Sequence, residues 1–429
     1  MKMVKADGRA EFELINSVRG RSAKIDRDVT AAVRKIMDDV RQGGDEALLG
    51  YCEKFDGVRP EKLEITKAEL DAACDKVPDK VIAALRRASE NIRKYHEHQK
   101  RESFVITRKD GVVMGQRVRA LKRVGLYVPG GKAAYPSSVL MNAVPAKVAG
   151  VDELIMVTPP SKNGVDPTIL AAASIAGVDR VFSVGGAQAV AALAYGTATV
   201  PKVDKIVGPG NIYVATAKKL SFGEVDIDMI AGPSEILVVA DETAEPRYLA
   251  ADLMSQAEHD PMACAVLLTD SEDIASRTLA ELDRQIKTLS RREIIERSLE
   301  DFGMAIVCRD IPQCLALAND IAPEHLELMT KDPMQLLGAV DNAGSVFLGS
   351  YSPEPLGDYF AGPNHVLPTS GTARFFSPLS VDTFIKKSSF IYYTRDALKE
   401  GADDIVTLAR AEGLTAHANS VEVRFDKNK

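Results

Sequence analysis

The sequence contains no tryptophan, and aromatic residues make up only 6% of its 429 positions. Surfaces that bind bases or sugars by stacking them on aromatic rings are therefore not indicated. Basic residues are not in excess either, since 54 lysines and arginines stand against 61 aspartates and glutamates, which gives a net charge of −7. This balance, without any block of like charges, does not favour nucleic acid as a partner.

Long apolar runs and paired cysteines are also lacking. No stretch of about 18 apolar residues occurs, and the N-terminus is too polar for a signal peptide. The sequence therefore predicts a cytoplasmic protein that does not enter a membrane. The five cysteines form no CxxC pair, so neither a disulfide framework nor a thiolate zinc site is indicated.

What is present is an ordinary globular composition, with 45% apolar and 27% charged residues. The first 100 residues follow a helical pattern, and residues 103–119 resemble a hairpin around Asp110-Gly111. From residue 123, short apolar runs alternate with helical patterns, which is typical of a parallel sheet with helices on both faces. The eight runs are residues 124–128, 154–158, 181–184, 205–207, 236–240, 265–269, 305–307 and 346–348.

Because eight strands exceed one comfortable open sheet, we predict an α/β fold with two lobes. Each lobe is expected to be Rossmann-like, incomplete and doubly wound around a parallel sheet, with a helical N-terminal segment and a small helical C-terminal tail added. The predicted boundaries are 1–25 for the N-terminal segment, 26–126 with 234–380 for the first lobe, 127–233 for the second lobe, and 381–429 for the tail.

Glycine-rich turns follow three of the predicted strands and open helices, at residues 129–131, 185–188 and 208–211. Glycines there allow main-chain amides at a helix N-terminus to approach an anion such as a pyrophosphate. None of the turns is a GxGxxG motif, and many such turns serve packing alone. They therefore indicate a nucleotide site only weakly.

The six histidines provide the first candidates for chemistry. His96 and His98 lie on the polar face of a predicted helix, where we expect them to be solvated. Gln256 and His259 are three residues apart near a helix end, which places both on one face, within reach of one metal ion. A histidine at a helix C-terminus is more often only a favourable cap.

The other polar candidates lie in loops or in the tail. Glu324 and His325 form an adjacent acid and imidazole at a strand entrance, while Asp358 and His365 lie in stretches rich in glycine and proline. Glu412 and His417 lie in the tail. Zinc accepts nitrogen and oxygen donors, and a plausible donor set is Gln256, His259, Asp358 and His417. From the residues alone, a zinc hydrolase also fits, because no HExxH or paired-carboxylate motif decides between the two.

Several long motifs occur in one order along nearly the whole chain. The most specific is Asp228-Met-Ile-Ala-Gly-Pro-Ser-Glu235, followed by Leu-Met-Ser-Gln-Ala-Glu-His259. The others include Ile-Ala-Pro-Glu-His325, Gly-Asp358-Tyr, Asn-His365-Val-Leu-Pro and Glu412-Gly-Leu-Thr-Ala-His417. Together they resemble the histidinol dehydrogenase family.

This resemblance implies a homodimeric enzyme that oxidises L-histidinol through L-histidinal to L-histidine with two NAD, the last step of histidine biosynthesis. It implies one zinc per subunit, held by Gln256, His259, Asp358 and His417, the last from a tail exchanged with the partner chain. It implies cofactor contacts from Tyr127, Gln188 and Asn211. The implied substrate contacts are Ser234, Gln256, His259, His325, Asp358, His365, Glu412 and His417.

Acid–base chemistry adds roles that agree with the resemblance. His325, with an ordinary pKa near neutrality, suits the base that removes the alcohol proton, and Glu324 can activate the water needed for the second oxidation. Cys264 is expected to pack in a buried strand rather than react. Three alternatives stay open: a paralogue that oxidises another small diol, a zinc hydrolase, and a nucleotide-binding protein without catalysis.

Overall fold

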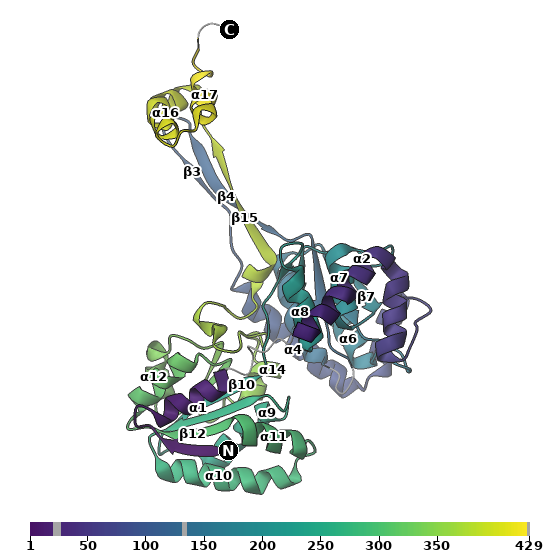
Figure 1. Ribbon diagram of the computed structural model, residues 1–429, viewed down its shortest axis with the longest axis vertical. Helices are drawn as coiled ribbons and strands as arrows, with labels where there is room; N and C mark the ends of the chain where they lie inside the picture. The colour runs from purple at the N-terminus through teal and green to yellow at the C-terminus, as the bar shows by residue number, and fades with distance from the viewer. Residues whose placement is uncertain (20–26, 131–134, 427–429) are drawn as a thin grey trace. The chain divides into compact units, whose positions relative to one another are not determined.

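The computed structural model describes residues 1–19, 27–130 and 135–426; Gly131, in the first glycine turn, lies outside them. The chain forms two compact units. The first comprises residues 1–99 and 121–384, and the second comprises residues 100–120 and 385–429. The first unit contains two six-stranded sheets, and the second contains one three-stranded sheet (Figure 1).

The first sheet is parallel throughout and carries helices on both faces. Its strands, in spatial order, are β1 (Lys2–Lys5), β12 (Gly303–Val307), β11 (Cys264–Thr269), β10 (Glu235–Ala240), β13 (His325–Met329) and β14 (Ser345–Leu348). One face packs on α9 (Pro246–Ala257), α10 (Glu272–Gln285) and α11 (Arg292–Phe302), and the other on α1 (Ala10–Arg19) and α12 (Ile311–Ile321). Because side chains alternate along a strand, the four central strands β10 to β13 contribute to both cores.

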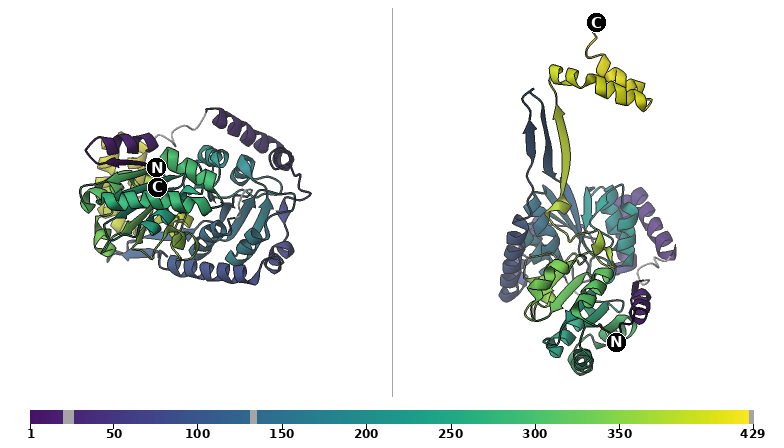
Figure 2. Two further views of the ribbon diagram at one scale, coloured as in Figure 1. Left: turned by 90° about the horizontal axis from the view of Figure 1, so that it is seen from below. Right: turned by 90° about the vertical axis from the view of Figure 1, so that its left-hand side faces the viewer.

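The second sheet is also parallel except at one edge. Its strands are β2 (Glu64–Ile65), β7 (Arg180–Ser183), β6 (Glu153–Thr158), β5 (Arg123–Tyr127), β8 (Lys205–Val207) and β9 (Asp226–Ile227), with β2 antiparallel to β7. One face carries α2 (Arg27–Asp56), α7 (Gly186–Tyr195) and α8 (Ile212–Ser221). The other carries α4 (Asp79–Glu97), α5 (Pro136–Ala149) and α6 (Pro167–Ala176), as Figure 2 shows.

These sheets confirm the predicted α/β class, and all eight apolar runs form strands. The boundaries differ from those predicted. The helix α2 packs on α7 and α8, and β5 is a central strand of the second sheet, so most of residues 26–126 belong with the second lobe rather than the first. The N-terminal segment supplies β1, which pairs with β12 at the edge of the first sheet.

One helix of this region is interrupted, and one local expectation was wrong. Within α2, two helical segments meet at a kink at Gly44, whose φ of 53° and ψ of −133° are not helical. His96 is fully buried rather than solvated, and its Nδ1 lies 2.8 Å from the main-chain oxygen of Ile92. A polar residue that satisfies its hydrogen bond inside its own helix gives no sign of burial in the sequence.

The second unit joins the predicted hairpin to the tail. The hairpin strands β3 (Phe104–Thr107) and β4 (Val113–Ala120) form as predicted, and β4 pairs with β15 (Ile385–Tyr392), a strand the helical tail was not expected to contain. Three helices follow, α15 (Arg395–Glu400), α16 (Ala402–Ala411) and α17 (Thr415–Glu422). Across the described residues of both units, no helix combines the length and apolarity needed to cross a membrane.

Candidate active site

His325 lies at the N-terminal end of β13, beside the start of β10. Ala322 ends α12 in a left-handed conformation with a φ of 54°, and the chain then turns through Pro323 into β13. His325 is 3% exposed, and its Nδ1 lies 2.9 Å from the main-chain oxygen of Glu235 and 2.8 Å from Nε2 of Gln256. The ring is therefore fixed by a strand on one side and by α9 on the other.

Glu324 is held beside this imidazole. It is 7% exposed, and its Oε2 accepts the main-chain N–H of Glu235 at 2.9 Å and lies 3.5 Å from Nδ1 of His325. The hydrogen bond fixes one carboxylate oxygen, so the acid has a defined position next to the ring. The adjacent acid and imidazole predicted from the sequence are thus brought together.

Two further acidic side chains face Nε2, the other nitrogen of the His325 ring. The helix α14 (Glu354–Tyr359) places Glu354 Oε1 at 3.8 Å and Asp358 Oδ1 at 4.0 Å from Nε2 of His325. Asp358 Oδ1 also lies 3.6 Å from Nδ1 of His365. Suitable ligand atoms of His325, Glu354 and Asp358 all lie within 4.8 Å of one another, an arrangement able to hold a metal ion.

Burial and this charge pattern shift the pKa values of the cluster in opposite directions. For His325, burial lowers the pKa, but the carboxylates of Glu324, Glu354 and Asp358 outweigh it and raise the pKa to about 10. For His365, burial and the charge of His325 lower the pKa to about 4. Burial and the Asp358 carboxylate raise the pKa of Glu354 to about 7. The cluster is therefore an acidic pocket that favours a cation.

The remaining predicted ligands and contacts of the first unit lie around this cluster. Gln256 is 1% exposed, and its Oε1 is buried without a hydrogen-bond partner among the described residues. His259 follows in the turn after α9, half-buried and close enough to Glu354 for its charge to oppose the rise in that pKa. Ser234 immediately precedes β10, and its main-chain oxygen accepts the N–H of Cys264 at 2.9 Å. An oxygen donor, an imidazole and a carboxylate fit a zinc site.

The predicted cofactor residues meet at a separate cavity of about 1180 Å³ on the second sheet. Tyr127 ends β5, and its hydroxyl accepts the N–H of Gly186 at 3.0 Å. Gln188 lies in the first turn of α7, and Asn211 caps α8 by accepting the N–H groups of Tyr213 and Val214. All three predicted residues line the cavity, and it has the size of a nucleotide site.

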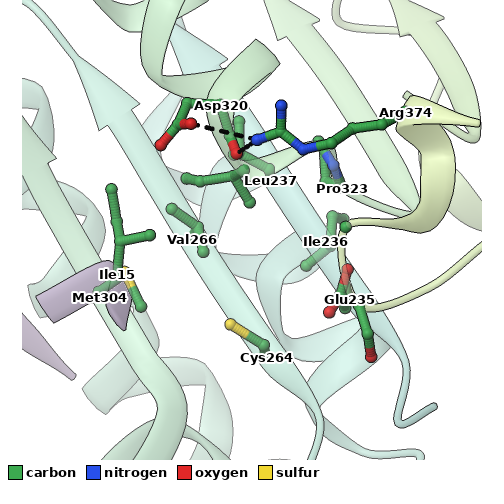
Figure 3. Close-up of a pocket in the computed structure, with 13 residues that line it drawn as sticks. Ile15, Glu235, Ile236, Leu237, Cys264, Val266, Met304, Asp320, Pro323 and Arg374 are labelled. Atoms are coloured by element: carbon green, nitrogen blue, oxygen red, sulfur yellow. Dashed lines mark hydrogen bonds and ion pairs between the residues drawn. The ribbon is translucent and has the colours of Figure 1, made fainter. Parts of the chain in front are cut away.

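Cys264 faces away from the cluster around His325. It belongs to the core on the α1 and α12 face of the first sheet, is 4% exposed, and its Sγ donates to the main-chain oxygen of Phe302 at 3.3 Å. Figure 3 shows it in a cavity of about 300 Å³ on that face, below the ion pair of Asp320 and Arg374. The predicted packing role agrees with this position.

Two predicted residues lie in the second unit instead. Glu412 follows α16 and His417 lies in α17, and both side chains are exposed. The structure therefore brings the other predicted residues together in two places of the first unit, while Glu412 and His417 belong to a different unit of the chain.

Comparison with known proteins decides the family. The family model of histidinol dehydrogenase matches residues 19–425. The chain belongs to the histidinol dehydrogenase family. The histidinol dehydrogenase of Clostridium acetobutylicum is 57% identical over 98% of this chain and 97% of its own, and that of Bacillus cereus is 53% identical over the full length of both. The crystal structure of histidinol dehydrogenase from Elizabethkingia anophelis superimposes with a TM-score of 0.93 at 38% identity, covering 99% of this chain and 98% of that one.

In this member of the family, three buried acids near the site were not singled out from the sequence. They are Asp252 on α9, Glu327 on β13 and Glu354 on α14. Glu327 Oε1 accepts the main-chain N–H of Glu354 at 2.8 Å, which anchors α14 to the sheet. Only the alternation of side chains along a strand could have indicated Glu327 from the sequence. It lies two residues after His325 and therefore faces the same side of the sheet.

The buried acids predict an unusual dependence of stability on pH. Burial raises the pKa of Asp252 to about 6, so the folded protein binds more protons than the unfolded chain between pH 4 and 6. Stability therefore falls as pH rises through this window. We expect Asp252→Asn to remove roughly 2 kcal/mol of that fall.

Urea unfolding of the metal-free protein between pH 4.5 and 8 measures this effect. Asp283→Asn, which changes an exposed acid on α10, is the matched control and should follow the wild-type curve. Parallel curves for Asp252→Asn and the wild type would contradict the prediction.

Proposed function

We propose that this chain is a zinc- and NAD-dependent histidinol dehydrogenase that oxidises L-histidinol through L-histidinal to L-histidine with two NAD. Family membership over nearly the whole chain supports the reaction. The single structural observation that carries the proposal is the buried cluster in which His325 lies between Glu324 on one side and Glu354 and Asp358 on the other.

The proposed zinc ligands of the first unit are Gln256, His259 and Asp358, and His417 completes the set. Bound zinc supplies a Lewis acid that anchors the imidazole and amine of the substrate. The orphaned Oε1 of Gln256 and the raised pKa of Asp358, which is caused by burial, support a cation in this pocket. Ser234, His365 and Glu412 are the proposed substrate contacts around it.

His325 is proposed as the base for the alcohol proton. In the absence of a cation, the neighbouring carboxylates hold its pKa at about 10, so the ring is charged at neutral pH and cannot accept a proton. A cation held by Asp358 would oppose those carboxylates and lower the pKa of His325 towards neutrality. The acidic pocket therefore links the state of the base to occupation of the metal site.

Glu324 is proposed to act in the second oxidation. The aldehyde must gain water before it can lose a second hydride, and a carboxylate fixed by the Glu235 N–H can accept a proton from that water. NAD supplies the hydride acceptor for both steps. For its binding we propose the cavity that Tyr127, Gln188 and Asn211 line.

The proposed assembly is a cytoplasmic homodimer in which each tail completes the site of its partner. Exposed apolar side chains on the hairpin and tail support a protein partner for the second unit. They include Val105, Ile106, Ile391, Tyr392 and Leu408, which are 51% to 71% exposed.

The ratio of NADH formed to L-histidinol consumed tests the proposed reaction. We expect a ratio of two. A ratio of one would indicate an alcohol dehydrogenase that stops at the aldehyde, and no NADH would remove the proposal in favour of a hydrolase or a binding protein. Small diols serve as competing substrates, because a paralogue would prefer one of them to L-histidinol.

The zinc site is tested by His259→Ala. We expect a folded protein with little bound metal and no measurable turnover, because the remaining residues around a site do not replace a lost ligand. Metal content is measured by elemental analysis after dialysis. His98→Ala removes an exposed histidine at the end of α4 and should keep both metal and activity. Full metal content in His259→Ala would refute the assignment.

A further inference from the structure

Asp228 opens the long motif 228–235, yet none of the roles above uses it. Its side chain follows β9 and is 2% exposed, and it forms an ion pair with Lys218 of α8, whose side chain is 4% exposed. Burying two charges is costly unless their remaining hydrogen bonds are satisfied. The other hydrogen-bond partners of Asp228 and Lys218 therefore indicate the role of this ion pair.

Both members of the pair bind one residue, Gly208. The Asp228 carboxylate accepts the N–H of Gly208 at 2.8 Å through Oδ2, and Lys218 Nζ donates to the carbonyl oxygen of Gly208, also at 2.8 Å. Two charged side chains thus fix both the N–H and the carbonyl oxygen of Gly208. Hydrogen bonds to charged groups are among the stronger ones in proteins.

Gly208 begins the cofactor loop, which we define as residues 208–211. Its φ is 109°, and a Cβ at this position would lie 2.2 Å from the main-chain oxygen of Tyr127, so the loop crosses directly over the end of β5. The loop ends at Asn211, the cap of α8. Asn211 and Tyr127 both line the 1180 Å³ cavity, whereas Lys218 and Asp228 are not part of its lining.

We propose that Lys218 and Asp228 are positioning residues for the nicotinamide dinucleotide, because they clamp Gly208 and so hold the cofactor loop against Tyr127. The inference rests on the proposed function, since it takes this cavity as the cofactor site. The pair acts through the loop without touching the ligand. Its loss lowers affinity for NAD and leaves substrate binding at the His325 cluster intact.

The test uses the zinc-loaded enzyme with Lys218→Met and, separately, Asp228→Asn. We expect Lys218→Met to weaken NADH binding by about tenfold or more, the loss typical of a hydrogen bond to a charged group. The KM for NAD should rise in parallel, whereas the Kd for L-histidinol without cofactor should stay within about twofold. Asp228→Asn keeps an acceptor for the Gly208 N–H, so it should fold and show a smaller loss in the same direction.

Lys205→Met is the matched control. Lys205 is also a shielded lysine of this lobe, with its side chain 12% exposed, but its Nζ lies 2.8 Å from Asp226 of β9 and donates to the main-chain oxygen of Thr383 instead of Gly208. We expect it to lower the melting temperature without changing the Kd for NADH.

Three outcomes overturn the inference. NADH affinity of Lys218→Met and Asp228→Asn within about twofold of wild type, with only stability reduced, shows that the pair is merely structural. Equal weakening of NADH and L-histidinol binding shows general damage. Failure of the wild-type enzyme to bind NADH removes the proposed function and this inference together. The wild-type measurement therefore separates failure of the proposed function from failure of the inference alone.

Discussion

Mixing two inactive variants, Asp358→Ala and His417→Ala, is expected to restore roughly a quarter of wild-type activity after joint unfolding and refolding with zinc. Asp358 lies in the first unit and His417 in the second. If tails are exchanged between subunits, a mixed dimer has one site with both defects and one site with neither. Random pairing makes about half of the dimers mixed, and half of their sites are intact.

A second mixture provides the negative control. Gln256→Ala and Asp358→Ala both change the first unit, so every site in their mixed dimers carries one defect whether or not the tails exchange. Refolded wild-type protein gives the upper reference. If the first mixture recovers no more activity than this control, each His417 serves its own chain and the exchanged dimer is wrong.

Glu324→Gln is expected to separate the two oxidations. Flux from L-histidinol to L-histidine should fall on the order of 10²–10⁴-fold, the usual contribution of one acid–base group. Interconversion of L-histidinol and L-histidinal should be less affected, because His325 is the proposed base for that step and the amide oxygen of the new side chain can still accept the N–H of Glu235. Stopped-flow assays that start from the alcohol and from the aldehyde measure the two steps separately.

Glu327→Gln is the control for this variant. Glu327 lies on the same strand and the same face as His325, and burial raises its pKa well above the ordinary value. The amide has the shape of the acid and keeps an oxygen that can accept the N–H of Glu354, so both oxidations should continue near wild-type rates. Equal losses in both steps for Glu324→Gln would show that the division of roles between Glu324 and His325 is wrong.

The fold could be predicted where hydrophobic pattern alone decides structure. Buried parallel strands are short apolar runs, and all eight runs form strands. Two edge strands, β1 and β15, could not be predicted in this way. Their side chains are mostly exposed, and their pairing with β12 and β4 depends on partners far away in sequence. For the same reason, the membership of α2 in the second lobe was not visible locally.

The candidate site shows a similar limit. Glu324 and His325 are adjacent, and Gln256 and His259 share a helix face, so short spacing was enough to single them out. Glu354 occurs in an ordinary Pro-rich stretch, and only the fold of α14 brings it to 3.8 Å from His325. The roles of individual residues came from the motif resemblance, since spacing alone left a hydrolase equally possible.

The three-stranded sheet of the second unit affects how the chain could be shortened. Its central strand, β4, is flanked by β3 and by the tail strand β15, so ending the chain at Phe384 would leave one edge of β4 unpaired and prone to aggregate. The first unit offers a cleaner junction. The chain passes between the units after residue 99, before residue 121 and after residue 384. Leu121 N–H donates to the oxygen of Phe384, and Val381 N–H donates to the side chain of Gln99, so the short 3-10 helix Val381–Phe384 holds these three points. A shortened chain for crystallising the first unit should therefore replace residues 100–120 with a short turn and end at residue 384.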